Sequence, residues 1–159
     1  MQRSVTHGTF KLERSYKAAP SKVYRAFADA EAKRKWFVGP PDWIEGEVSL
    51  DFRVGGYEIN EGGPEGGPIS RFVCLYQDII PNERFIYTYE MFHDAKRISV
   101  SLATMELRPE GSGTRLVLTE QGAFLDGFDD PTVREEGTRG LLEQLAVALD
   151  EAPAERSLA

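Results

Sequence analysis

The sequence predicts an α+β protein in which seven antiparallel strands form one sheet and a long C-terminal helix packs against it. Three observations carry this prediction. Residues Phe10, Leu12 and Tyr16 alternate with polar neighbours, which is the period-two pattern of a half-buried strand. Strand-like runs then fill residues 44–121, separated by connections of hairpin length. After residue 127 the apolar residues recur at the spacing of an amphipathic helix.

Two short helices are expected between the first strand and the rest of the sheet. Pro20 suits the first turn of a helix, and Asp29 is placed to cap a second helix that ends at Trp36 and Phe37. The two prolines of residues 38–42 cannot lie inside a helix and therefore end it. The six strands that follow are predicted at residues 44–50, 55–60, 69–79, 84–92, 97–108 and 113–121.

The final helix is predicted to begin at Pro131, after a cap formed by Asp129 or Asp130. Its apolar stripe comprises Val133, Leu141, Leu142, Leu145 and Leu149, while Arg134, Glu135, Arg139, Glu143 and Asp150 take the other side. Residues 153–159 show no pattern. The chain is therefore expected to form a single domain over residues 1–159, with an ordered core over about residues 7–151.

Composition excludes several function classes. The net charge is −7 and charges of both signs are interleaved, which disfavours nucleic acid and anionic membranes as partners. The basic run at residues 33–35 is interpreted as a solvated helix end. No apolar run is long enough to span a membrane or to act as a signal peptide, and the single cysteine, Cys74, cannot form an internal disulfide. A soluble cytoplasmic protein is expected.

The sequence carries no catalytic or metal-binding motif. With only two histidines and no HExxH or paired CxxC, neither a metal site nor a cofactor is expected. Cys74 lies among apolar neighbours and is interpreted as an inert core thiol. The glycine-rich residues 62–67 lack the lysine of a phosphate-binding loop and include Glu65, so they are interpreted as a hairpin loop.

Aromatic residues in phase along one strand point to a cavity. Tyr87, Tyr89 and Met91 share one face of the strand. Packing in the core would explain any single aromatic residue, but a buried tyrosine hydroxyl also needs a polar partner. Glu120 is in phase with Leu118, so it is either a rim residue in water or a functional carboxyl group with a raised pKa. The predicted lining is Trp36, Phe37, Tyr57, Tyr87, Tyr89, Met91, Met105, Leu118, Glu120, Phe124 and Leu141.

Several local motifs resemble one known family. Residues 19–27 (APSKVYRAF) lead to Trp36-Phe37, and they are followed by residues 51–56 (DFRVGG), 80–84 (IPNER) and 113–120 (GTRLVLTE). In order and spacing these motifs resemble the activator of heat-shock protein 90 ATPase homologue family, within the helix-grip superfamily of START and birch-pollen-allergen-like (SRPBCC) domains. The resemblance implies a curved sheet wrapped around the C-terminal helix, with an apolar cavity between them.

The resemblance also bears on partners. The co-chaperone that gives the family its name carries a further N-terminal domain for which 159 residues leave no room, so a chaperone partner is not expected. Gly140-Leu141 stands where the family commonly has Gly-Trp, which implies a wider cavity. A small hydrophobic molecule is the expected partner, and the sequence leaves open whether the chain forms a homodimer.

Three functions remain open at this stage. The first is a binding protein for a small hydrophobic molecule, the second a polyketide cyclase or aromatase-like enzyme that uses Glu120 or a tyrosine, and the third a stress-response or co-chaperone-like interaction module. An open apolar pocket would favour the binder, a pocket with a buried carboxylate near a tyrosine the enzyme, and a filled interior the interaction module. Gly137 and Gly140 are predicted to allow close approach to the final helix or to leave room for a ligand.

Overall fold

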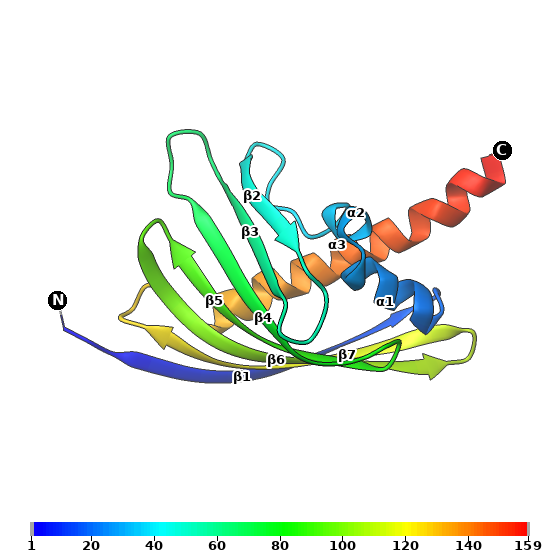
Figure 1. Cartoon of the computed structure of the whole chain (residues 1–159), viewed down its shortest axis with the longest axis horizontal. Coiled ribbons are helices and arrows are strands. Elements are labelled where there is room, and N and C mark those ends of the chain that lie inside the picture. The colour runs from blue at the N-terminus through cyan, green and yellow to red at the C-terminus, as the bar shows by residue number, and fades with distance from the viewer. Residues whose placement is uncertain (1, 159) are drawn as a thin grey trace.

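Seven antiparallel strands form one strongly curved sheet, and a long helix lies along its concave side (Figure 1). The structure, a computed structural model, describes residues 2–158, and it describes side chains for residues 2–150. The predicted α+β helix-grip architecture is confirmed. The strands are β1 (Val5–Tyr16), β2 (Ile44–Leu50), β3 (Tyr57–Gly63), β4 (Ser70–Ile80), β5 (Arg84–His93), β6 (Lys96–Glu110) and β7 (Gly113–Leu125).

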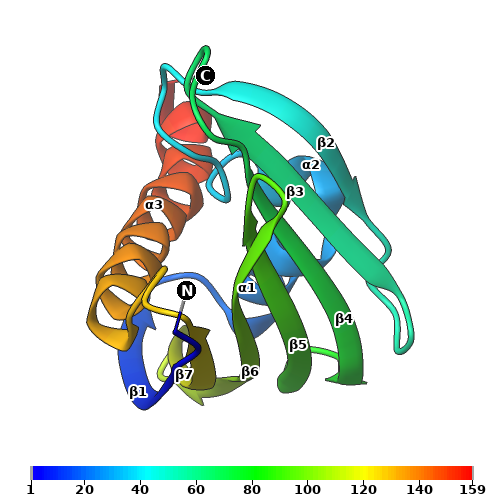
Figure 2. The ribbon, with the colours of Figure 1, turned by 90° about the vertical axis from the view of Figure 1, so that its left-hand side faces the viewer.

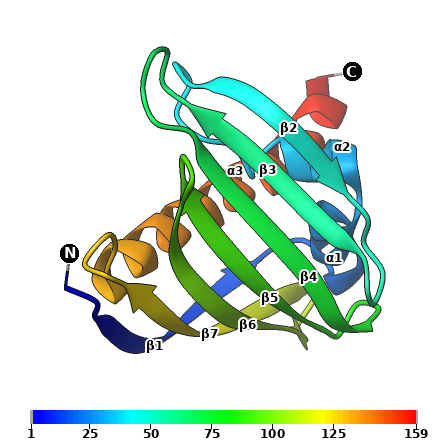
Figure 3. The same ribbon diagram turned by 60° about the vertical axis from the view of Figure 1, so that its left-hand side comes forward.

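The sheet has the order β1-β7-β6-β5-β4-β3-β2, so only the pairing of β1 with β7 joins strands distant in sequence (Figure 3). The remaining strands form a meander, because short hairpins can connect only antiparallel neighbours. β3 continues to Gly63, where Gly62 pairs with Ser70, so the start of the glycine-rich segment belongs to the sheet and not to the loop. β6 and β7 are also longer than predicted.

Two short helices, α1 (Pro20–Ala28) and α2 (Ala30–Arg34), follow β1 as predicted. Pro20 opens α1, and the Asp29 carboxylate accepts a hydrogen bond from the Ala32 amide at 3.0 Å, which caps α2. α2 ends at Arg34, so Trp36 and Phe37 lie just beyond it. The indole of Trp36 donates to the Ala26 carbonyl at 2.9 Å, which fixes the chain after α2 against α1.

The long helix α3 (Pro131–Leu158) crosses the open side of the curved sheet (Figure 2). Asp130 caps it by accepting from the Val133 amide at 3.0 Å. Leu142, Leu145 and Leu149 are buried as predicted, whereas Val133 is 56% exposed near the start of the helix. The helix continues past residue 151, where the ordered core was expected to end. No helix within residues 2–158 has both the length and the apolar character needed to cross a membrane.

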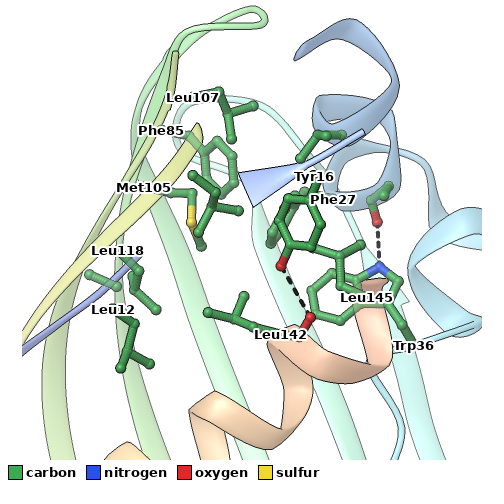
Figure 4. Close-up of a cluster of buried hydrophobic side chains, with 14 of the residues drawn as sticks. Leu12, Tyr16, Phe27, Trp36, Phe85, Met105, Leu107, Leu118, Leu142 and Leu145 are labelled. Carbon is green, nitrogen blue, oxygen red and sulfur yellow. Dashed lines mark hydrogen bonds between the residues drawn. The ribbon is translucent and has the colours of Figure 1, made fainter. Parts of the chain in front are cut away.

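The hydrophobic core fills only one end of the space between α3 and the sheet. A row of paired residues, Phe85, Met105, Leu118 and Leu12, runs across β5, β6, β7 and β1 and forms its floor. From the other side, α1 and the second half of α3 close this end, where the Tyr16 hydroxyl donates to the Leu142 carbonyl at 3.1 Å (Figure 4). The other end of the same space is not filled.

Candidate functional site

A pocket of about 380 Å³ occupies the unfilled end, between the first half of α3, the inner face of the sheet and the segment after α2. Its walls draw on strands β3, β4, β5 and β7, so residues distant in sequence meet there. The lining residues are Phe37, Val38, Gly39, Trp43, Asn60, Gly62, Ser70, Phe72, Tyr87, Tyr89, Met91, Glu120, Asp129, Val133, Arg134, Gly137, Thr138 and Leu141.

Small side chains on β6 and β7 create the room. Tyr87 on β5 and Glu120 on β7 both pair with Ala103, which lies between them on β6. One row further along, Tyr89 is separated from Gly122 by Ser101. Because Ala103, Ser101 and Gly122 project little from the concave face, the long side chains of Tyr89 and Glu120 can meet above β6.

Glu120 belongs to a buried hydrogen-bond network at the inner wall of the pocket. The Tyr89 hydroxyl donates to Glu120 Oε2 at 2.6 Å and accepts from Arg134 Nη1 at 3.1 Å. Arg134 Nη2 donates to Ser99 Oγ at 2.8 Å and to Asp129 Oδ2 at 2.6 Å. We call these five residues the Glu120 network. It ties the first turn of α3 to β5, β6 and β7.

Burial sets the protonation of this network. Glu120 is 3% exposed, and its loss of solvent raises the pKa of its carboxyl group. The Tyr89 hydrogen bond and the Arg134 charge lower this pKa, but the effect of burial is larger. Burial likewise raises the pKa of Tyr89, and the nearby Glu120 charge adds to that effect. Tyr89 therefore stays a neutral hydroxyl, which can donate to Glu120 while it accepts from Arg134.

Two polar groups at or beside the Glu120 network have no hydrogen-bond partner among the described residues. One is the second carboxylate oxygen of Glu120, Oε1, and the other is the hydroxyl of Tyr87. Burial raises the pKa of Tyr87, so its hydroxyl is also neutral. Both groups are free to bond a molecule held in the pocket.

The structure places several of the predicted lining residues on the pocket wall and others elsewhere. Phe37, Tyr87, Tyr89, Met91, Glu120 and Leu141 line the pocket. Trp36, Met105, Leu118 and Phe124 do not line the pocket, and each is packed inside the protein. Phe124 lies beneath Arg134, whose guanidinium carbon is 5.2 Å from its ring centre, so it supports the network from outside the pocket.

Tyr57 was predicted to face the cavity, and this is wrong. Its side chain is 55% exposed on the outer face of β3, because the next residue, Glu58, takes the inner face. Glu58 is buried there and accepts hydrogen bonds from Lys33 Nζ and the Tyr76 hydroxyl, each at 2.6 Å. The prediction assumed that the aromatic residue of the strand, and not the charged one, would point inward.

Lys33 was interpreted as part of a solvated helix end, and this is also wrong. It is 7% exposed, and its ammonium lies 4.5 Å from the ring centre of Phe37 as well as against Glu58. A second, small cavity of about 50 Å³ lies beside this ion pair. Phe37 lines both that cavity and the main pocket, so its ring separates the ion pair from the pocket.

Arg134 is the main site residue that the sequence reading missed, since it was assigned to the outer side of the last helix. Its side chain is 11% exposed and reaches into the network. The spacing in the sequence could have indicated this position. Arg134, Gly137 and Leu141 are three and four positions apart and therefore share one face of a helix. All three line the pocket.

The two helix glycines do not provide close approach. A Cβ added at Gly137 or Gly140 would meet no atom within 4 Å, so nothing packs against the bare backbone. Gly137 lines the pocket and Gly140 does not. The alternative prediction, that a glycine leaves room for a ligand, therefore stays open for Gly137 alone.

Other groups in the described part of the chain add no chemistry to the pocket. Cys74 is buried, and burial raises the pKa of its thiol to about 12, as expected for an inert core residue. Within residues 2–158, no three His, Cys, Asp or Glu side chains gather as metal ligands would.

Comparison with known proteins identifies the family. The family model described as Activator of Hsp90 ATPase homolog 1-like protein matches residues 17–150. The chain belongs to this family. None of the curated proteins compared with the chain matches it.

Solved structures of similar proteins share this fold. A crystal structure of a Rhizobium loti protein is 48% identical, with a TM-score of 0.85, over 91% of this chain and 99% of that one. An uncharacterised protein of Rhizobium leguminosarum is 41% identical, with a TM-score of 0.90, over 95% and 99%. An AHSA1-like protein of Aeromonas hydrophila, at 17% identity and a TM-score of 0.70 over 92% and 94%, matches in fold.

Proposed function

We propose that this member of the Activator of Hsp90 ATPase homolog 1-like family binds a small, largely apolar molecule in the pocket between α3 and the sheet. The observation that carries the proposal is a pocket of about 380 Å³ with aromatic walls and two unsatisfied polar groups at its inner end. Ligand sites in proteins have this character: mostly apolar, with a few polar groups that fix orientation. The pocket is within the size range of such sites.

The apolar wall is formed chiefly by aromatic rings. Phe37 and Phe72 contact edge to face with ring centres 5.2 Å apart, and Phe72 and Tyr89 lie 5.0 Å apart. These contacts hold the rings in place without filling the space in front of them. An interior packed solid with side chains would instead have favoured an interaction module, whose function lies on its surface.

A second candidate, an acid–base enzyme acting on the bound molecule, is favoured by one specific observation. Glu120 is a buried carboxyl group whose pKa is raised by burial, and it is hydrogen-bonded to a tyrosine beside the pocket. Such a group can hold a proton nearer to neutral pH and pass it to or from a substrate. This candidate differs from the first in that the molecule leaves the pocket chemically changed.

Native mass spectrometry of freshly purified protein tests the binding proposal. Gly137→Phe fills the pocket mouth, while Gly140→Phe places the same ring on the same helix outside the pocket. The wild-type protein and Gly140→Phe are expected to carry a co-purified small molecule, and Gly137→Phe is expected to lack it. If no molecule co-purifies, N-phenyl-1-naphthylamine is added as the probe, and the same difference between the variants is expected. Equal retention by the two variants, or no retention by the wild type, contradicts the proposal.

The same measurement addresses the enzyme candidate. A co-purified molecule that Glu120→Gln retains in a different chemical form from the wild type would indicate turnover. An identical mass in both proteins would leave binding as the function. The substitution keeps an acceptor oxygen for Tyr89 and replaces the titrating carboxyl group by a neutral amide.

A further inference from the structure

We infer that the pocket selects molecules whose apolar body ends in a protonated amine. This inference rests on the proposed binding function and adds to it the chemical class of the ligand. Three features of the pocket wall lead to it: an unsatisfied carboxylate oxygen, an arginine whose charge is already paired with Asp129, and aromatic rings that favour a cation.

The unsatisfied oxygen is Glu120 Oε1. The other oxygen of that carboxylate accepts the Tyr89 hydroxyl at 2.6 Å, and within the described residues Oε1 accepts no hydrogen bond. No ion pair within 4 Å joins Glu120 to Arg134 in the described part of the chain, because the Tyr89 hydroxyl lies between them. A buried carboxylate that lacks a direct cation is costly, and a donor on the ligand would offset that cost.

The positive charge of Arg134 is already paired with the carboxylate of Asp129. Its Nη1 donates to Tyr89, and its Nη2 donates to both Ser99 and Asp129. Arg134 is the one basic residue on the wall, against two acidic ones, Glu120 and Asp129. A carboxylate or phosphate on the ligand would therefore meet two negative charges and one positive charge that Asp129 already pairs, whereas an ammonium would balance the wall.

The aromatic walls favour the same charge. Phe37, Phe72 and Tyr87 line the pocket, and a cation placed over the face of an aromatic ring is attracted by its negative potential. The free hydroxyl of Tyr87 supplies a second acceptor, and Ala103 is the only residue that separates it from Glu120 across the sheet. An ammonium group has three donors, so it can bond both Glu120 and Tyr87 at once.

Three naphthalene probes of nearly equal size test the inference by isothermal titration calorimetry at pH 7.5. They are 2-(1-naphthyl)ethylamine, 2-(1-naphthyl)ethanol and 1-naphthaleneacetate, which carry a positive, a neutral and a negative group. A hydrogen bond to a charged partner predicts that the amine binds about 10- to 100-fold more tightly than the alcohol, with the carboxylate weakest. This comparison uses the wild-type protein alone.

A variant pair assigns the preference to Glu120. Glu120→Gln is expected to abolish the advantage of the amine over the alcohol. Glu90→Gln is the matched control, since Glu90 is on the outer face of β5, where it pairs with Arg97. It is expected to keep the preference of the wild type.

The outcomes separate this inference from the binding proposal on which it rests. If N-phenyl-1-naphthylamine binds but the amine probe has no advantage over the alcohol or the carboxylate, the inference is wrong and the binding proposal stands. If Glu120→Gln keeps the full amine preference, the assignment to Glu120 is overturned. If neither N-phenyl-1-naphthylamine nor any of the three probes binds, both fail together.

Discussion

Tyr89 on β5 donates its hydroxyl hydrogen to Glu120 on β7 at 2.6 Å, across the intervening strand β6. Ser101 and Ala103 on β6 are small enough for the two side chains to meet above them. The same hydroxyl accepts from Arg134 at the start of α3. The Tyr89 hydroxyl therefore lies at the inner wall of the pocket and links the helix to the sheet.

Replacing Tyr89 and Tyr87 separately by phenylalanine tests the stability contributed by the network. Tyr89→Phe leaves the Glu120 carboxylate without its hydrogen-bond donor and removes one of the three acceptors of Arg134, and it is expected to lower the free energy of unfolding by about 1–3 kcal/mol. Tyr87→Phe removes a hydroxyl that bonds no described residue, so a change below about 0.5 kcal/mol is expected. Urea denaturation measures both. Equal losses in the two variants would show that the network stabilises nothing.

Glu120→Gln should reveal the raised pKa through the pH dependence of stability. Burial raises the folded-state pKa of Glu120 above its ordinary value of 4.5, so the folded state holds this proton more tightly than the unfolded state does. The stability that the proton contributes is complete below pH 4.5 and is lost as the pH rises through the folded-state pKa. The unfolding free energy of the wild type minus that of the variant should therefore fall with rising pH.

The groups that surround Glu120 set the control for this measurement. Tyr87 and Tyr89 approach it from β5 and Arg134 from α3, while its paired neighbours Phe10 and Ala103 carry no charge. All of these groups are present in both proteins, so their own titration cancels in the difference. A difference that stays constant would mean that the Tyr89 hydrogen bond and the Arg134 charge cancel the effect of burial, and a difference that rises with pH would mean that they outweigh it.

Removing one member of the buried ion pair should be costly. Lys33→Met leaves Glu58 as a buried charge with only Tyr76 as a partner, and a loss of about 3–5 kcal/mol is expected. Lys33→Met combined with Glu58→Gln should recover part of the loss, because a glutamine at position 58 still accepts from Tyr76 without a charge. Arg34→Met, which breaks the exposed pair with Glu45, should cost less than about 1 kcal/mol. Thermal denaturation of the four proteins measures this series, and similar losses for Lys33→Met and Arg34→Met would contradict the account.

Alanine at the two helix glycines should stabilise the protein. Each glycine lies inside α3 with open space beyond its Cα, so Gly137→Ala and Gly140→Ala should each raise the unfolding free energy by about 0.5–1 kcal/mol. Only Gly137→Ala adds a methyl group to the pocket, so only this variant should change the affinity for N-phenyl-1-naphthylamine. A destabilised Gly137→Ala would revive the close-approach interpretation.

The sequence predicts the fold well because each element carries its own local signal. Alternation in β1, the Asp29 cap of α2 and the leucine stripe of α3 each depend on residues close together in the chain. Strand ends are predicted less well. Glycine at positions 62 and 63 indicates a loop, yet β4 extends far enough to hydrogen-bond this segment into the sheet.

The pocket is predicted only in part, because side-chain phase gives the face of a strand but not the position along it. Leu118 and Glu120 share a face of β7, yet Leu118 belongs to the floor of the core and Glu120 to the wall of the pocket. Their place depends on which residues pair with them, Met105 in one case and Ala103 in the other. Tyr57 shows the opposite error, since a long-range ion pair turned its charged neighbour Glu58 inward.

Binding of a small molecule between α3 and the sheet is the central claim, and a titration of ¹⁵N-labelled protein with N-phenyl-1-naphthylamine tests it most directly. The account predicts that the amide signals of Gly62, Gly137 and Thr138, which line the pocket, shift with one common dissociation constant. Those of Val100 and Leu102, exposed on the outer face of β6, should stay in place. Shifts confined to the outer face, or no shifts at saturating probe, would contradict the account.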